Sequence, residues 1–166
     1  MLAKEVHCSN LSLTNPNPRH LRQVLRLGTS SSASPNNIVG TTPSTICRMA
    51  ALEDLYLRYV FGMQGTIPTC VGDLANLTSI DYTYAGTLSG TLPRGLCKLR
   101  KLQKLQFQHT YGLSGTIPDC LGEDQPRLSA ISLNFNDLHG TIPESLCLIG
   151  DSLVYLLLYQ NDLSGE

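Results

Sequence analysis

The stretch Gly140-Thr141-Ile142-Pro143 sets the fold, because it or a close variant recurs at a fixed interval along the chain. The variants read GTTP at 40–43, GTIP at 65–68, GTLP at 90–93 and GTIP at 115–118. Their prolines are each 25 residues apart: Pro43, Pro68, Pro93, Pro118 and Pro143. A fixed period of about 20 to 50 residues indicates a solenoid or array, in which each repeat buries its apolar side by stacking on its neighbours.

A second pattern, LxxLxL or a conservative variant, recurs from Leu52 onward. Its apolar positions are Leu52, Leu55 and Leu57; Leu77, Ile80 and Tyr82; Leu102, Leu105 and Phe107; Leu128, Ile131 and Leu133; and Leu153, Leu156 and Leu158. Alternation with a period of two indicates a short strand with one side facing inward. A further aliphatic residue stands three positions after each proline: Ile46, Val71, Leu96, Leu121 and Leu146. Each coil is therefore predicted to bury about six apolar groups, at about 2 kcal/mol for each fully buried side chain.

The two patterns are best seen together in Leu128-Ser-Ala-Ile-Ser-Leu-Asn-Phe-Asn-Asp-Leu-His-Gly-Thr-Ile-Pro143. This segment resembles the plant-specific class of leucine-rich repeat, LxxLxLxxNxLSGxIP, and the resemblance covers roughly residues 36–166. It implies an α/β repeat solenoid, a right-handed curved coil with a concave parallel β-sheet and short helical turns on the convex side. The family includes receptor-like and polygalacturonase-inhibitor-like ectodomains, which bind proteins, peptides or small ligands and are not enzymatic by themselves.

The first 39 residues fit the period poorly, so we expect an N-terminal cap or irregular first repeat at 1–39 ahead of the repeat array at 40–166. Two interpretations of this part are open. Pro18 begins a helix whose apolar residues include Val24 and Leu25, or Leu25 and Leu27 form the strand of an early repeat. In the second case the polar segment 28–35 is a loop.

Composition and the last residues bound the partners of the chain. A net charge of -1 with 15% charged residues gives no basic face for nucleic acid or for an anionic membrane. The longest apolar run, Leu153 to Tyr159, is far shorter than the about 20 residues that span a bilayer. The sequence ends at 163–166, just where the next phrase should begin, so we expect an array truncated there. Its last coil should expose an apolar end around Leu156, Leu158 and Leu163, through which we expect contact with a partner.

Three successive coils depart from the family pattern at its asparagine. The asparagine is present as Asn36, Asn136 and Asn161, whereas the departing coils carry Val60, Ala85 and Thr110. The departing coils also hold one extra residue and a nearby glycine: Gly62, Gly86 and Gly112. One interpretation is a variant of the bend with a permissive backbone, and the other is that the altered loops shape a binding site.

The binding face is predicted to lie on the outward positions of the strands. Just before the asparagine position these residues are Tyr59, Tyr84, His109 and Phe135, which we expect to stack in one column and to act as anchors. Supporting residues on the same face are Tyr56, Arg58, Asp81, Gln108, Asn134 and Tyr159. Aromatic groups beside neutral hydrogen-bonding groups suit a protein, peptide or carbohydrate partner. The alternative is that the rings stack only on one another.

Six cysteines and two sequons favour a secretory or extracellular compartment, although a cytoplasmic chain with free thiols is the alternative. One pairing joins Cys8 to Cys47, Cys70 to Cys97 and Cys120 to Cys147, and another joins Cys47 to Cys70 and Cys97 to Cys120 and leaves Cys147 over. The sequence does not choose among the connectivities. The sequons place candidate glycosylation sites at Asn10 and Asn76.

Other chemistry is weakly indicated. Cysteines and histidines show no metal-ligand spacing, so we expect no metal and no cofactor. A hydrolase site would have to use Asp81, His109 and Ser132 on an open sheet that excludes no water, so we expect no enzyme. The remaining alternative is a structural or ice-interacting solenoid that uses a threonine column, one strand spacing apart, on its flank: Thr41, Thr66, Thr91, Thr116 and Thr141.

Overall fold

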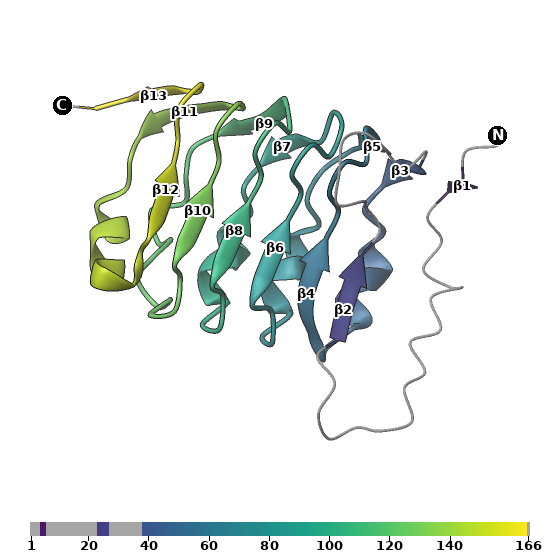
Figure 1. Cartoon of the computed structure of the whole chain (residues 1–166), viewed down its shortest axis with the longest axis horizontal. Helices are drawn as coiled ribbons and strands as arrows, with labels where there is room; N and C mark the ends of the chain where they lie inside the picture. The colour runs from purple at the N-terminus through teal and green to yellow at the C-terminus, as the bar shows by residue number, and fades with distance from the viewer. Residues whose placement is uncertain (1–3, 6–22, 27–37, 166) are drawn as a thin grey trace.

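The five LxxLxL segments and residues 23–26 form a six-stranded parallel sheet, here called the main sheet, in the spatial order β12-β10-β8-β6-β4-β2 (Figure 1). The structure is a computed structural model and describes residues 4–5, 23–26 and 38–165. The strands are β2 (Gln23–Arg26), β4 (Leu52–Tyr56), β6 (Ser79–Asp81), β8 (Lys104–Gln106), β10 (Ala130–Ser132) and β12 (Tyr155–Leu157).

The register of the main sheet puts equivalent residues of successive coils side by side. Leu55 lies opposite Ile80, Ile80 opposite Leu105, and Leu105 opposite Ile131. All four side chains are fully buried. Because successive strand residues point to opposite faces, this register also aligns the outward side chains into columns.

Residues at the start of the GTxP phrases and just before them form a second line of parallel strands along one edge of the solenoid, at the top of Figure 1. A three-stranded and a four-stranded group are joined by a bridge between Thr66 and Ser89. Their strands are β1 (Lys4–Glu5), β3 (Ile38–Thr41), β5 (Gly62–Gln64), β7 (Ser89–Thr91), β9 (Gly112–Gly115), β11 (Asp137–Thr141) and β13 (Asp162–Ser164).

The recurrent glycine of the phrase is needed for two reasons. Gly115 has a φ of 79°, which residues with a side chain rarely adopt. A Cβ at this position would also lie 2.7 Å from Cγ2 of Thr91 in the preceding coil. The threonine methyl therefore packs on the bare glycine of the next coil, which explains why the two residue types recur together.

Short 3-10 helices cover the side of the solenoid away from the main sheet. They are η2 (Ser44–Arg48), η3 (Thr69–Asp73), η4 (Arg94–Lys98) and η5 (Glu144–Ser152). Each begins after a proline in extended conformation at its N-cap, so the recurrent proline marks the entry to the turn. Gly72 of η3 lies so close to Gly95 of η4 that a Cβ on Gly72 would be 2.4 Å from the Gly95 backbone.

The core is a continuous stack of aliphatic side chains with two aromatic rings inside it. Tyr82 and Phe107 take the third apolar position of their coils and stack with centroids 5.1 Å apart. The Tyr82 hydroxyl lies 3.4 Å from Oγ1 of Thr42, and burial raises the pKa of this hydroxyl. The predicted solenoid with a parallel sheet and short helical turns is confirmed.

One local expectation needs correction. Val24 and Leu25 lie in β2, which pairs with β4, so the helix that would have begun at Pro18 is wrong at these residues. Ile142 takes the same place in its phrase as the buried Ile117, but it is 51% exposed because no later coil covers it among the described residues. Leu156 is exposed as expected, whereas Leu158 and Leu163 are half-buried. In the described part of the chain, no helix has the length and apolar character needed to cross a membrane.

Candidate functional site

Four rings stack in one line at the ends of the main-sheet strands, and we call them the aromatic ladder: Tyr59, Tyr84, His109 and Phe135. Successive ring centroids are 5.2, 4.3 and 4.0 Å apart, with interplanar angles of 14°, 7° and 15°. All four side chains are half-buried. Because the faces of the inner rings are covered by their neighbours, ring edges are what these residues present to solvent. The predicted stacked column is therefore present.

The backbone holds every ladder residue in the left-handed region. The φ values are 54°, 55°, 54° and 59°, and Gln160, the equivalent residue of the next coil, has a φ of 57°. This conformation costs about 1–2 kcal/mol for a residue with a Cβ. The N–H of each ladder residue donates a hydrogen bond to a carbonyl of the next coil, for example from Tyr84 to Gln108 at 3.0 Å. Since every coil repeats the conformation, it belongs to the fold, and the choice of a ring at each position is particular to this chain.

Two further rings, Phe61 and Tyr111, lie beside the ladder and were not predicted as site residues. Phe61 is edge-on to Tyr59 and Tyr84, at 6.5 and 6.3 Å between centroids. Tyr111 is edge-on to His109 at 5.8 Å, and its Oη lies 3.1 Å from Nδ1 of His109. Phe61 and Tyr111 are 48% and 61% exposed. The available signal was that each occupies the extra residue of an altered bend.

Several polar residues on the sheet face support the ladder from below. Asp81 and Asn134 point away from the core but are only 2% and 1% exposed. Oδ1 of Asp81 accepts a hydrogen bond from the Thr83 N–H at 2.9 Å, and its Oδ2 lies 3.2 Å from Nε of Arg58. The Ser132 hydroxyl donates to Oδ1 of Asn134 at 2.9 Å. These two site predictions are therefore placed as buried supports, without an accessible polar atom for a ligand.

The remaining predicted residues lie around the ladder. Arg58 places its guanidinium 5.7 Å from the ring centroid of Tyr59, so its charge is shared between this ring and a buried carboxylate. Tyr159 packs edge-on against Phe135 at 5.4 Å between centroids. Tyr56 and Gln108 are half-buried on the same face. All ten predicted residues are thus on one side of the main sheet or at its strand ends.

Enclosure by the neighbouring rings changes the chemistry of His109. Its imidazole lies between Tyr84 and Phe135, and the resulting loss of water lowers the pKa of His109 below its ordinary value of 6.5. The ring is therefore neutral at neutral pH. The ladder consequently carries hydrogen-bonding groups but no net charge of its own.

In one of the three altered bends, a threonine hydroxyl stands in for the side-chain amide of the asparagine. Nδ2 of Asn136 donates to the carbonyls of Phe107 and Leu133 at 2.7 and 2.8 Å. In the preceding coil the Thr110 hydroxyl lies 2.9 Å from the Phe107 carbonyl and 3.3 Å from the Tyr82 carbonyl. The threonine thus takes over part of the amide's role.

Val60 and Ala85 have no such polar group and are fully buried in the core. Asn36 lies outside the described residues. The residue at the asparagine position is therefore structural. The extra residue that follows it is exposed in two of the three coils, and the interpretation that these loops shape a binding site stays a prediction.

Two disulfides staple pairs of adjacent coils. Cys47 is bonded to Cys70 and Cys97 to Cys120, each with Cα atoms 5.8 Å apart, which is within the ordinary range. The second of the two predicted pairings is therefore the correct one. Cys147 is an exposed free thiol, and Cys8 lies outside the described residues. Disulfides persist in oxidising compartments and favour an extracellular setting.

The two sequons differ in what can be said of them. Asn10 lies outside the described residues. Asn76 is half-buried, and its Nδ2, the atom that would carry a glycan, donates to the Ala50 carbonyl at 3.0 Å. Its Oδ1 accepts from Nζ of Lys101 at 2.7 Å. Glycosylation of both residues stays a prediction.

The described residues give little support to a hydrolase site or a metal site. Asp81 and Ser132 bond to other residues and His109 stacks within the ladder, so no contact joins these three into a relay among the described residues. The described part of the chain also holds no cluster of potential metal ligands.

The threonine column is staggered. Thr91 lies opposite Ser114 and Thr66 opposite Ser89, so successive threonines are offset by two residues along the strands. They are therefore about 8 Å apart, and the expected single strand spacing is wrong.

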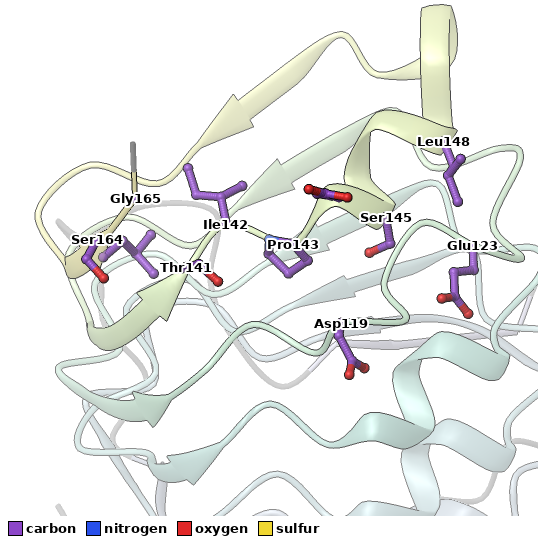
Figure 2. A pocket seen from close by; sticks show the side chains of 11 residues that line it. Asp119, Glu123, Thr141, Ile142, Pro143, Ser145, Leu148, Ser164 and Gly165 are labelled. Atoms are coloured by element: carbon purple, nitrogen blue, oxygen red, sulfur yellow. The ribbon is translucent and has the colours of Figure 1, made fainter.

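A hollow of about 990 Å³ lies away from the ladder, at the far end of the stack (Figure 2). Exposed Ile142 and Leu148 line it together with the carboxylates of Asp119 and Glu123. None of the predicted site residues borders it. The hollow is open to solvent, so we do not assign the site to it.

Comparison with known proteins gives matches among solved structures. No family model and no curated protein matches this chain. A chain of the complex of the Arabidopsis receptor kinase HAESA with the peptide hormone IDA and the co-receptor SERK1 matches with a TM-score of 0.74 and 31% identity, over 86% of this chain and 22% of that one. This chain is a leucine-rich-repeat solenoid. It resembles the ectodomains of plant leucine-rich-repeat receptor kinases.

Two further structures support this assignment of the leucine-rich-repeat fold. A TDR receptor matches with a TM-score of 0.71 and 29% identity, over 78% of this chain and 22% of that one. A plant ice-binding protein matches with a TM-score of 0.68 and 29% identity, over 76% of this chain and 39% of that one. The solenoid described here thus spans about a fifth of the length of the two receptor chains.

Proposed function

We propose that this leucine-rich-repeat solenoid is a recognition module that binds an uncharged segment of a peptide or protein along the aromatic ladder. One observation carries the proposal: four stacked rings and two flanking rings form a continuous, half-exposed aromatic surface over successive coils. Aromatic residues on rigid supports are the side chains that dominate binding energy at protein interfaces.

The geometry favours a peptide or protein over a carbohydrate. A sugar ring packs its C–H groups on the face of an aromatic ring, which carries negative charge density. In the ladder both faces of the inner rings and one face of each end ring are covered, because the rings stack on each other at 4.0 to 5.2 Å. The ring edges and the tyrosine hydroxyls remain available, and they suit carbonyl groups and apolar side chains.

The charges around the ladder favour an uncharged ligand segment. The Arg58 guanidinium is paired with the buried Asp81 carboxylate, and the His109 ring is neutral. Neither residue therefore offers an unpaired charge to the ligand.

The similar structures support this class of partner. The HAESA structure holds a peptide hormone and a co-receptor, and a structure of the BIR3 and SERK2 complex, 25% identical to this chain, holds two proteins together. The disulfides of this chain are in keeping with an extracellular partner.

The test is selection of binding peptides. The full chain is immobilised and used to select from a displayed library of random dodecapeptides, and captured peptides are measured against the double variant Tyr84→Ala, His109→Ala. We expect captured peptides that lose at least tenfold in affinity for the double variant. The matched control is Leu148→Ala, an exposed apolar residue on η5, which leaves capture unchanged. No selected peptide, or equal capture by the double variant, overturns the proposal.

The ice-interacting alternative is favoured only by the similarity to a plant ice-binding protein and by the exposure of the threonine column. The packing of each threonine methyl on the next glycine and the stagger between coils count against a regular ice-matching array. Thermal hysteresis that is present in the wild type and lost in a Thr91, Thr116 double variant would favour this alternative.

A further inference from the structure

The two flanking rings stand on either side of a position without a side chain. Phe61, Gly86 and Tyr111 are equivalent residues of three successive coils, each the extra residue of an altered bend. Coils of a parallel sheet are about 4.8 Å apart, so Phe61 and Tyr111 arise about 10 Å apart across Gly86. This separation admits one side chain of ring size between them.

The gap is fixed by the fold. Gly86 has a φ of 64°, and a Cβ on it would lie 2.4 Å from the Met63 carbonyl oxygen and 2.6 Å from that of Phe61. No side chain can occupy this position without displacing the neighbouring backbone. Gly86 therefore adds no side chain of its own between the two rings.

Three polar groups beside the gap already have hydrogen-bond partners. The Thr87 N–H donates to the Met63 carbonyl at 3.0 Å, and the Ala85 N–H to the Tyr82 carbonyl at 3.0 Å. The Tyr111 hydroxyl is engaged with His109. These groups are already partnered, so what the gap offers a ligand is ring surface from Phe61 and Tyr111.

We propose that the gap over Gly86, between Phe61 and Tyr111, is a subsite for a single aromatic side chain of the bound peptide. This inference rests on the proposed function and makes it more specific, because it assigns one ligand residue to one place. An aromatic side chain fits best, since edge-to-face contacts between rings add about 0.5–1.5 kcal/mol to the burial of area. A charged side chain would lose water there and gain no partner.

The experiment uses small probes on the full chain, so that it does not depend on an unknown partner. N-acetyl-phenylalaninamide is titrated into isotopically labelled protein, and the amide resonances of Gly86, Thr87 and Gly112 are followed. N-acetyl-lysinamide and N-acetyl-glycinamide are the matched probes. We expect saturable shifts at these amides, in the millimolar range, with the phenylalanine probe alone.

Variants separate the subsite from unspecific binding. Replacing both rings, Phe61→Ala with Tyr111→Ala, is expected to weaken the phenylalanine probe at least tenfold. Both side chains are largely exposed, so the core stays intact, and unchanged resonances of the other coils verify this. Tyr155→Ala is the control, because Tyr155 is a tyrosine of equal exposure, 62%, on the distant strand β12. This control variant is expected to bind the probe as the wild type does.

The possible failures are distinguishable. Equal shifts with the lysine probe, or undiminished binding to the double-ring variant, overturn the subsite. If selected dodecapeptides still depend on Tyr84 and His109 in that case, the ladder remains a recognition surface and only the subsite is wrong. Probe binding at Gly86 without any captured peptide would instead overturn the proposed function.

Discussion

Asn136 allows the energetic role of the bend to be tested quantitatively. Its Nδ2 donates to two carbonyls at 2.7 and 2.8 Å, with a longer contact of 3.4 Å to the Asn134 carbonyl, and its Oδ1 accepts from the Thr110 N–H at 3.2 Å. In the variant Asn136→Ala both carbonyls keep a partner, since Thr110 still reaches Phe107 O and Asn161 still reaches Leu133 O. Only the buried Thr110 N–H is orphaned.

The expected cost follows from this difference. Two lost hydrogen bonds at about 1 kcal/mol each and one orphaned donor at about 1–3 kcal/mol give about 3–5 kcal/mol of destabilisation. Asn136→Thr should cost about half as much. In the preceding coil the equivalent residue, Thr110, bonds the Phe107 carbonyl, and a threonine at 136 should bond the Leu133 carbonyl in the same way. Asn161→Ala should cost about 1 kcal/mol, since Asn161 is half-buried and water replaces its amide.

Guanidinium unfolding monitored by far-UV circular dichroism measures all three variants against the wild type. A loss of stability that decreases from Asn136→Ala to Asn136→Thr to Asn161→Ala supports the conclusion that the carbonyls keep a second partner. A loss below about 0.5 kcal/mol for Asn136→Ala would refute it, because a net hydrogen bond of ordinary strength already exceeds that figure. Equal losses for the alanine and threonine variants of Asn136 would show that a threonine does not replace the amide.

Three other outcomes are expected. The double variant Cys97→Ala, Cys120→Ala removes one disulfide, which closes a loop with a sequence separation of 23 residues. The unfolding free energy should fall by about 3 kcal/mol. An unchanged midpoint of guanidinium unfolding would contradict this. Gly72→Ala places a Cβ against the Gly95 backbone and costs about 1–3 kcal/mol of stability. Gly95→Ala costs less, because the nearest atoms to its Cβ would be 3.2 Å away. The reverse order of the two variants in thermal unfolding would be inconsistent with this packing. The pKa of His109 is lower in the folded than in the unfolded chain, so the unfolded chain binds more protons at acidic pH. The unfolding free energy therefore falls as the pH drops below 6.5 and through the folded pKa. The variant His109→Gln should lack this part of the pH dependence.

The fold could be predicted because its cause is local and repeated. A 25-residue period with LxxLxL and GTxP fixes which side chains face inward, and the strand register follows once Leu55, Ile80 and Leu105 align. The ladder could be predicted for the same reason, since residues at one position of successive coils must stack.

The parts that depend on exact packing could not be predicted. Alternation identifies Asp81 and Asn134 as outward but does not reveal that neighbouring side chains cover them. The flanking rings of Phe61 and Tyr111 could not be predicted, because the repeat pattern does not fix the direction of an inserted side chain. The stagger of Thr66 and Thr91 depends on the register of the second line of strands, which the proline period alone leaves undetermined.

The cysteines illustrate a further limit of sequence reasoning. Cys47 and Cys97 precede their partners by the same 23 residues, yet the interval from Cys70 to Cys97 also joins adjacent coils. Only the direction of the side chains separates the two pairings. This direction comes from the 3-10 helices that carry Cys47, Cys70 and Cys97 and from the turn that carries Cys120.

The central claim is that the aromatic ladder serves binding more than stability. The most direct measurement is the dissociation constant of a selected dodecapeptide by calorimetry, together with the unfolding free energy, for Tyr84→Ala and His109→Ala separately. We expect each variant to lose at least tenfold in affinity while it loses less than about 2 kcal/mol of stability, because these side chains are only half-buried. An unchanged dissociation constant with a large loss of unfolding free energy would contradict the account and make the ladder a structural stack.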